Sequence, residues 1–327
     1  MKRHLLILFA ALLPLLASAH DFEVDGIYYN ITSNTEAEVT YKGDSFDGYY
    51  VYTGGYSDST ITIPATVTYE GVEYSVTRIG NHAFDHCWDL ISITLPESVT
   101  SIGGDAFSDC RNLTAINIPE GVTSIEPSVF NNCESLIAIN IPEGVTSIGE
   151  YAFCNCEDLT TINIPEGVTS IASYVFFRCF SLTAITLPEA VTSIGEYALY
   201  NCSSLTTITI PKGVTYIGTS VFRNCNRLTT ITCKAETPPT IEYYTFDRID
   251  KSIPLYVPAA SVEAYKGTEH WSKFTNIMEI SAEAGINAMS TAGGQQRAII
   301  YDLTGRRVEN ATKPGIYIVN DKKVVIK

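Results

Sequence analysis

Four residues in one short stretch have side chains that can ligate metals: His82, Asp85, His86 and Cys87. Zinc sites in proteins use imidazole, carboxylate and thiolate ligands, and the two histidines would share one face if this stretch were helical. Cys87, however, belongs to a regular series of cysteines whose side chains we expect to point into a core. We therefore interpret the stretch as polar surface and predict no metal; a metal site is the alternative.

No sequence pattern indicates catalysis. The G-x-S-x-G, H-E-x-x-H, P-loop and dinucleotide-binding patterns do not occur. After the first nineteen residues the histidines are His20, His82, His86 and His270, and none has an evident nucleophile or carboxylate partner in the sequence. We predict no catalytic residue, no cofactor and a non-enzymatic function.

Six aromatic residues are the candidates for a protein-binding site: Tyr151, Tyr174, Phe177, Phe180, Tyr197 and Tyr200. The three tyrosines at 151, 174 and 197 are spaced by 23 residues, and so are Phe177 and Tyr200. Earlier in the chain the corresponding positions hold small or polar residues, Asp105, Ser108, Ser128 and Asn131, so packing does not require rings there. Exposed aromatic surface is typical of binding sites. The alternative is that the rings only pack on each other.

These positions belong to a unit that recurs every 23 residues. Leucine returns at that interval at seven positions: Leu90, Leu113, Leu136, Leu159, Leu182, Leu205 and Leu228. A fixed period of this length is typical of a solenoid, in which each unit forms one coil and stacks on the next. Stacking is required because one unit cannot bury enough apolar surface to offset the conformational entropy of its own ordering.

The unit of residues 113–135, LTAINIPEGVTSIEPSVFNNCES, predicts two short strands and a closing turn. The first strand ends at Pro119, because proline cannot donate to a strand ladder. Gly121 turns the chain into a second extended segment, residues 122–125, and residues 129–133 close the coil. We predict a β-rich solenoid with short parallel strands and tight helical or 3₁₀ closing turns.

Seven of the nine cysteines occupy one position of successive units: Cys87, Cys110, Cys133, Cys156, Cys179, Cys202 and Cys225. Identical side chains in register point the same way, which favours a column of buried free thiols over the torsion that a disulfide requires. One or two disulfides are the alternative. Cys233 falls on a core position of a strand, and only Cys154, at a variable position, is expected to be exposed.

Two polar rows follow from the same period. Asn117, Asn140 and Asn163 lie at outward strand positions and could form an amide ladder with rungs about 4.8 Å apart. A glutamate follows the proline in five units, at Glu97, Glu120, Glu143, Glu166 and Glu189, and Lys212 interrupts the row. We interpret this row as solvated, because nothing resembles the Gly-Asp repeats of calcium-binding β-rolls; shared calcium is the alternative.

The N-terminal residues predict export. Residues 2–3 are basic, residues 5–16 are apolar, and Ala17-Ser18-Ala19 is a typical cleavage site of a signal peptide. No later stretch reaches the roughly 18 to 20 apolar residues that span a bilayer. We expect a β cap before the first coil, with a tight hairpin at Asp25-Gly26, and a protruding hairpin about Glu70-Gly71 within the first coil.

The repeat degrades after Leu228, and residues 255–258 supply one last strand. A short helix from Ala259 to Lys266, stopped by Gly267, should cap the array together with three apolar residues, Trp271, Phe274 and Ile277. The final residues read as two strand pairs that turn at Thr304-Gly305 and Asn320-Asp321. The predicted organisation is signal peptide 1–19, N-terminal cap 20–59, solenoid 60–258, C-terminal cap 259–280, linker 281–297 and β tail 298–327.

The formal net charge is −15, which argues against nucleic acid and anionic lipid as partners. Both need clustered Lys and Arg to displace counterions.

The unit L-x-x-I-x-I-P-E-G-V-T-S-I-G-x-x-A-F-x-x-C resembles the BspA-type, or Treponema-type, leucine-rich repeat of bacterial surface proteins. The segment SIPLYVPAASVEAYKG is similar to the piece that commonly ends such arrays in Bacteroidota. The tail, with IYDLTGRRV, PGIYIV and KKVVIK, resembles the C-terminal sorting domain of the type IX secretion system.

These resemblances imply the location and the kind of partner. The tail implies contact with the secretion machinery and display at the outer-membrane surface of a Gram-negative bacterium. The best known members of the repeat family are adhesins for matrix and plasma proteins such as fibronectin and fibrinogen. We therefore predict a secreted or cell-surface adhesin that binds protein; the alternative is a structural or cell-cell contact protein, active in co-aggregation, without a host ligand.

Overall fold

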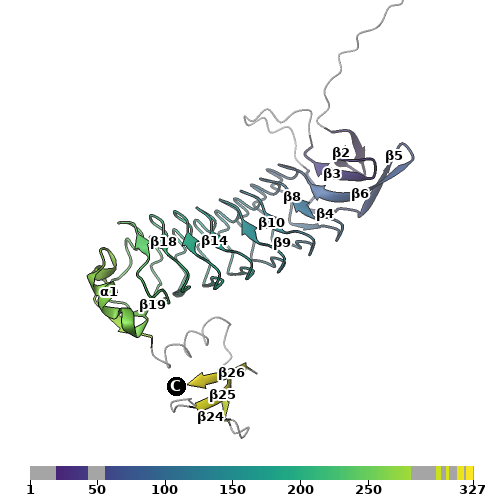
Figure 1. Cartoon of the computed structure of the whole chain (residues 1–327). Coiled ribbons are helices and arrows are strands. Elements are labelled where there is room, and N and C mark those ends of the chain that lie inside the picture. Colours follow the sequence, from purple (N-terminus) through teal and green to yellow (C-terminus); the bar gives the residue numbers. More distant parts are fainter. Residues whose placement is uncertain are drawn as a thin grey trace, which may run out of the picture.

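The computed structural model describes residues 20–42 and 56–280, together with the backbone of four strands between residues 300 and 326. Successive coils stack along one axis, from the N-terminal sheet to the short helix α1 (Val262–Gly267), and this arrangement confirms the predicted solenoid (Figure 1). The predicted signal peptide, the predicted linker and residues 43–55 lie outside the described residues.

The first strands of successive coils lie in parallel, with ladder pairing within three groups of three consecutive strands. These strands are β4 (Thr60–Thr62), β7 (Ser92–Thr94), β9 (Ala115–Ile116), β11 (Ala138–Ile139), β13 (Thr161–Asn163), β15 (Ala184–Thr186), β17 (Thr207–Ile210), β19 (Thr230–Cys233) and β21 (Leu255–Val257). The register keeps equivalent residues side by side, as in Ile139, Ile162 and Ile185, whose side chains are buried. A further strand, β22 (Ile277–Glu279), pairs with β21, so residues 255–258 do not form the last strand as predicted.

The second strand of each coil forms a separate parallel column. Its members are β8 (Ser101–Ile102), β10 (Ser124–Ile125), β12 (Ser147–Ile148), β14 (Ser170–Ile171), β16 (Ser193–Ile194), β18 (Tyr216–Ile217) and β20 (Thr240–Ile241). Each is only two residues long, with one side chain buried and one directed outward. The two columns are opposite walls of one apolar core.

The closing turns are tight, as predicted, and make 3₁₀-type bonds to the carbonyl three residues earlier at alternate positions without forming a regular helix. In residues 103–110, alternate N–H groups donate within the turn and to the next coil: Ser108 donates to Asp105 at 3.1 Å, and Phe107 donates to Val129 at 2.9 Å. A helix would direct its N–H groups to its own carbonyls. In the stacked coils, half of the N–H groups of the turn instead donate to carbonyls of the neighbouring coil, because buried backbone groups must be paired.

A stack of phenylalanine rings runs through the core beneath the closing turns. Adjacent rings lie 5.3–5.8 Å apart in the series Phe84, Phe107, Phe130, Phe153 and Phe176. Tyr56 ends the stack at the N-terminal side, 4.9 Å from its first ring. At the other end Trp271 and Phe274 pack on Phe246 at 5.3 and 5.2 Å. The two ends of the solenoid are therefore closed by aromatic residues that lie outside the regular units.

The cysteine column is buried, and its thiols are free, which supports the favoured interpretation over disulfides. From Cys110 to Cys225, each Sγ of the column donates to a backbone carbonyl of the preceding coil, as Cys110 does to Phe84 at 3.1 Å. Cys154, however, is buried rather than exposed, with only 5% of its surface accessible. The equivalent position of the next coil holds the larger Phe177. Burial raises the pKa of the Cys154 thiol to about 12.

The N-terminal sheet has the strand order β1-β2-β3-β6-β5, with β8 of the solenoid also paired to β6. Its strands are β1 (Phe22–Val24), β2 (Ile27–Ile31), β3 (Glu36–Thr40), β5 (Thr66–Tyr69) and β6 (Val72–Ile79). Both predicted hairpins are confirmed, at Asp25-Gly26 and at Glu70-Gly71, and all four turn residues have positive φ. The second hairpin belongs to this sheet because its strand β6 pairs with β3. The same strand also pairs with β8 and so connects the sheet to the solenoid.

The C-terminal end of the solenoid consists of η1 (Ala259–Ser261), α1 and η2 (Trp271–Lys273). The helix α1 includes Gly267, one residue beyond the predicted end, and Trp271 and Phe274 are buried while Ile277 is only partly buried. In the tail, β23 (Ile300–Asp302), β24 (Arg307–Val308), β25 (Gly315–Val319) and β26 (Lys322–Ile326) form one antiparallel sheet. The two predicted strand pairs are present, and their predicted turns lie outside the described residues.

Candidate protein-binding surface

Each closing turn between residues 80 and 227 holds two residues in the left-handed backbone region, four positions apart, and the last turn holds one, Arg248. The pairs include His82 and His86, Asp105 and Asp109, Ser128 and Asn132, Tyr151 and Asn155, Tyr174 and Arg178, and Tyr197 and Asn201. Left-handed φ costs about 1–2 kcal/mol for an ordinary L-residue, and Asn and Asp tolerate it best. The second position of the pair mostly follows that preference, whereas the first position holds tyrosine in three consecutive coils.

The six predicted aromatic residues lie together on these turns, and we call this group the aromatic edge. Tyr174 stacks between Tyr151 and Tyr197, with ring centroids 4.7 and 4.9 Å away and ring planes within 12° of parallel. Phe177 stacks on Tyr200 at 5.0 Å and contacts Tyr174 at 5.7 Å. Phe180 lies under the guanidinium of Arg178 at 5.2 Å.

The rings thus pack on each other, as the alternative interpretation required, but they are not buried. Tyr151 is 38% exposed, and the other five members of the aromatic edge are partly exposed. Because the rings stack along the solenoid axis, they present their edges to solvent rather than their faces. Desolvation raises the pKa of Tyr174, so its phenol stays protonated and can donate a hydrogen bond.

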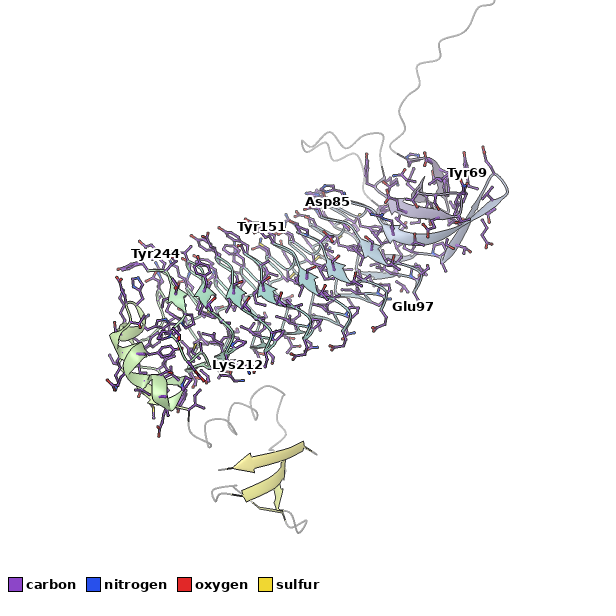
Figure 2. The ribbon with its side chains drawn as sticks, viewed as in Figure 1. Tyr69, Asp85, Glu97, Tyr151, Lys212 and Tyr244 are labelled. Carbon is purple, nitrogen blue, oxygen red and sulfur yellow. The ribbon has the colours of Figure 1, made fainter. Side chains whose placement is uncertain are left out.

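The aromatic surface extends further than the sequence indicated. Tyr243 and Tyr244 are 62% and 49% exposed and contact each other at 4.8 Å. Arg223 lies 5.6 Å from the ring of Tyr244, and the amine of Lys273 lies 4.3 Å from the ring of Tyr243. Figure 2 shows Tyr151 and Tyr244 along the same edge of the solenoid. The 23-residue period misses them because Phe246 stacks on Phe222 at a spacing of 24 residues.

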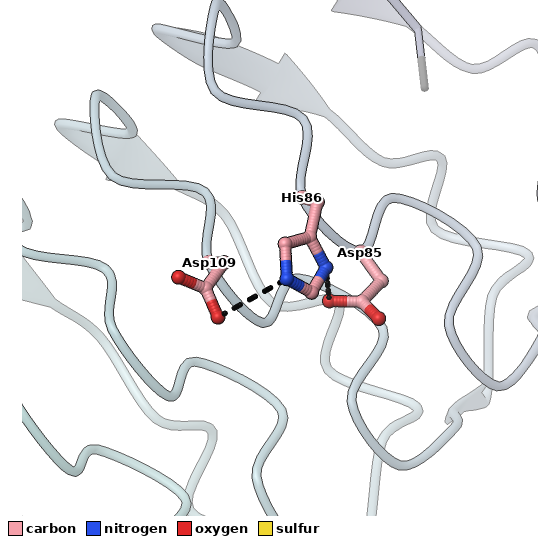
Figure 3. Close-up of side chains that lie close together, drawn as sticks. All are labelled: Asp85, His86 and Asp109. Carbon is pink, nitrogen blue, oxygen red and sulfur yellow. Dashed lines mark ion pairs between the residues drawn. The ribbon is translucent and has the colours of Figure 1, made fainter. Parts of the chain in front are cut away.

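Polar residues replace the rings on the first closing turns, and here a sequence prediction is wrong. His86 contacts two carboxylates, with Nδ1 2.7 Å from Asp85 and Nε2 3.6 Å from Asp109, so histidine does have carboxylate partners (Figure 3). His82 contacts Asp85 through Nδ1 at 3.3 Å, and this hydrogen bond raises the pKa of His82. Asp109 belongs to the following coil, which is why the local sequence stretch did not reveal it.

His86, Asp85 and Asp109 offer metal-ligating atoms within 4.8 Å of one another, but their arrangement fits an ion-pair bridge better than a metal site. The imidazole of His86 lies between the two carboxylates, which approach opposite nitrogens of its ring (Figure 3). A single cation cannot take all three groups without turning that ring. Asp109 also accepts from Arg111 at 3.0 Å, which places a positive charge beside the group. Cys87 is buried in the thiol column, as predicted.

An amide ladder exists, but not at the predicted asparagines. Asn155 donates to Asn132 at 2.7 Å, and Asn132 donates to Asp109 at 3.1 Å. These residues occupy the second left-handed position of successive closing turns. Of the predicted set, Asn117 accepts from the backbone N–H of Leu95 and donates to its carbonyl, both at 3.1 Å. Asn163 donates to Glu143 at 3.4 Å.

Two other surfaces are less suited to specific binding. The outward side chains of β11, β13 and β15 line a shallow hollow of about 520 Å³, with small residues such as Ala138, Thr161 and Ala184 at its floor. The five glutamates of the predicted row are all exposed, and the row lies along the edge opposite to Asp85 and Tyr151, as Glu97 and Lys212 mark in Figure 2. Both observations fit solvated surface.

Comparison with known proteins agrees with the repeat. The model of the BspA type leucine rich repeat region matches residues 66–179 and 123–253. A solved leucine rich cell surface protein from Faecalibacterium prausnitzii is 31% identical, covers 74% of this chain and 71% of its own, and has a TM-score of 0.58. The solved leucine rich repeat protein of T. pallidum is 26% identical, covers 62% of this chain and 87% of its own, and has a TM-score of 0.50.

A comparison with curated proteins gives no match. None of the helices in the described ranges is long and apolar enough to cross a membrane. The matched family model covers more than half of the chain, and the match to the Faecalibacterium protein supports the same assignment. The chain therefore belongs to the BspA type leucine rich repeat family.

Proposed function

We propose that this protein is an exported, surface-displayed adhesin that binds host matrix or plasma proteins, such as fibronectin- or fibrinogen-like ligands, through its aromatic edge. Membership of a leucine-rich repeat family with a cell-surface neighbour suggests protein–protein interaction as the general role. The aromatic edge carries the proposal, because it places tyrosine in left-handed positions where other coils use His, Asp or Ser. Stacked, partly exposed aromatic residues supply large contact area at low entropic cost.

Other classes of function have less support. The net charge of −15 disfavours nucleic acid and anionic lipid, which bind through clustered cations. The carboxylates beside His86 are already paired with His and Arg side chains, Asp85 with His86 and Asp109 with Arg111. A leucine-rich repeat solenoid is typically a scaffold for protein binding rather than an enzyme.

The proposed location rests on the two ends of the sequence. Residues 1–19 read as a signal peptide, and residues 298–327 resemble a type IX sorting domain of Bacteroidota. Deletion of residues 298–327 should trap the protein in the periplasm, measured by cell fractionation and surface labelling. Normal surface display of the deletion variant would refute the sorting role of the tail.

Binding of the exported chain, residues 20–327, to immobilised fibronectin and fibrinogen tests the adhesin proposal. Replacement of Tyr174, Phe177, Tyr197 and Tyr200 by Ser should abolish binding and leave the chain folded, with a lower melting temperature because ring contacts are lost. Tyr216→Ser is the matched control, because Tyr216 is exposed on β18, outside the closing turns. A collapse of stability in the quadruple variant would instead identify the rings as packing residues.

The second candidate is a structural or cell-cell contact protein without a host ligand. It is favoured by the charges along the closing turns, which change sign between the two halves of the edge and suit contact between copies. Co-aggregation of cells that display the protein, together with no binding to any matrix protein, would select this function over the adhesin.

A further inference from the structure

We infer that the partner of the aromatic edge is a second copy of this chain, paired antiparallel about a two-fold axis. The inference rests on the proposed protein-binding role of the edge and assigns it contact between copies, the second candidate above, in place of a host ligand. Two-fold pairing uses the same surface on both copies, so the surface must complement itself. The ring spacing and the charges on the closing turns both meet this condition.

The first observation is the spacing of the rings. Tyr151, Tyr174 and Tyr197 follow each other at 4.7 and 4.9 Å, and Phe177 and Tyr200 at 5.0 Å, so a row of ring edges faces outward at the spacing of the coils. A partner that follows the whole row must present groups at that spacing. A second solenoid of the same sequence does so, and side chains at equal spacing can interdigitate along two ladders.

The second observation is the charge of the closing turns on either side of the rings. Nine acidic residues lie on the four turns between residues 80 and 158: Asp85, Asp89, Asp105, Asp109, Glu126, Glu134, Glu150, Glu157 and Asp158. Arg111 is the one arginine or lysine on those turns. The next three turns, between residues 172 and 227, carry Arg178, Arg223 and Arg227 and a single acid, Glu196. These closing turns are therefore acidic toward the N-terminal end and weakly basic between residues 172 and 227, and the last turn is mixed, with Glu242, Asp247, Arg248, Asp250 and Lys251.

These charges select the antiparallel arrangement. Parallel pairing would place the acidic turns of the two copies against each other, and like charges across an interface cost stability. Antiparallel pairing places the three acidic turns between residues 103 and 158 of each copy against the three basic turns between residues 172 and 227 of the other. With the two-fold axis between residues 149–158 and residues 172–181, Glu157 of one copy faces Arg178 of the other, and Tyr151 faces Tyr174.

Sedimentation of the exported chain, residues 20–327, tests the pairing. We expect a dimer whose dissociation constant rises about tenfold or more in Tyr174→Ser/Tyr197→Ser, because buried aromatic residues dominate interface energies. Tyr216→Ser should leave it unchanged. A wild-type chain that stays monomeric at all concentrations up to 100 µM would overturn the inference.

A charge exchange between copies gives a sharper test. Arg178 and Glu157 form an exposed ion pair of 3.7 Å within one copy, and in the proposed dimer they also face each other across the axis. Arg178→Glu and Glu157→Arg should each weaken the dimer, and an equal mixture of the two variants should restore it. Mixing cannot repair an ion pair within one copy, so failure of the mixture to dimerise contradicts the proposed arrangement.

The result also separates this inference from the proposed function. A monomeric chain whose fibronectin or fibrinogen binding is lost in Tyr174→Ser/Tyr197→Ser would assign the edge to a different protein: the binding role would stand and the pairing would be wrong. If the variant changes neither self-association nor any protein binding, both proposals fail.

Discussion

The closing turns near the N-terminus and those in the middle of the solenoid share one backbone but use it differently. In residues 80–112 the left-handed positions hold His82, His86, Asp105 and Asp109, which connect neighbouring coils by hydrogen bonds and ion pairs. In residues 149–204 the first left-handed position holds tyrosine, and the connection between coils is ring stacking. The hydrogen bonds between turns follow the same pattern in both regions.

This difference separates the parts of the closing turn that fold the chain from the parts that are free to vary. The Cys column is the same in both regions, and the buried Phe column differs only at Leu199, so these columns must carry the stability that the turn needs. The left-handed positions accept His, Asp, Ser or Tyr without a change in backbone. Their side chains can therefore be selected for binding rather than for folding.

The largest expected effect is in the shared core. Phe130→Ala removes a fully buried ring that stacks between Phe107 and Phe153, and should lower the free energy of unfolding by about 3–5 kcal/mol. Phe107→Ala should cost a similar amount, because its environment is equivalent although its closing turn is polar. Chemical denaturation measures both, and a large difference between the two would show that the regions do not share one core.

A smaller effect is expected at the left-handed positions. Tyr174→Asn loses two stacked contacts, worth about 0.5–1.5 kcal/mol each, and gains about 1 kcal/mol because Asn tolerates positive φ. The net loss should stay below about 2 kcal/mol in the same denaturation assay. A loss as large as that of Phe130→Ala would mean that the tyrosines belong to the core.

The pH dependence of stability should differ between the regions. The hydrogen bond that His82 donates to Asp85 raises the pKa of His82, with a further contribution from the charge of Asp105, and burial raises the pKa of Asp105. Both groups bind protons more tightly when folded, so their stabilisation is present at low pH and is lost as the pH rises through the folded values.

His82→Gln removes the histidine part of this effect. The difference in melting temperature between wild type and variant should therefore be larger at pH 5.5 than at pH 8. Tyr151→Gln, at the equivalent position of the aromatic region, is the control and should show a difference that does not change over this range. Equal pH profiles for His82→Gln and the control would contradict the assigned direction.

The smallest effect is expected for thiol reagents. All nine cysteines of the chain are buried, including those of both regions, and burial raises the pKa of thiols such as Cys154 and Cys225 to about 12. The native protein should not react with Ellman's reagent at pH 8, and the unfolded protein should release nine equivalents. Rapid reaction of one thiol in the native state would show that Cys154 is exposed after all.

Much of the site could be predicted because the repeat converts sequence position into spatial position. Residues 23 apart lie side by side, which predicted the tyrosine column and the thiol column. The prediction failed where the period changes, at Tyr244, and where contacts cross between different positions of adjacent units, as His86 and Asp109 do. A periodic pattern says which residues share a column, but not which columns touch.

The sequence by itself determined the solenoid, its coil boundaries and its buried columns, because regular apolar spacing leaves only one way to bury those side chains. The tertiary structure decided the conformation of the closing turn. Half of its N–H groups had to bond the neighbouring coil, so the turn could not form a regular helix, and two of its residues took positive φ. That conformation stacks the rings along the axis and turns their edges outward, and the binding proposals depend on this arrangement.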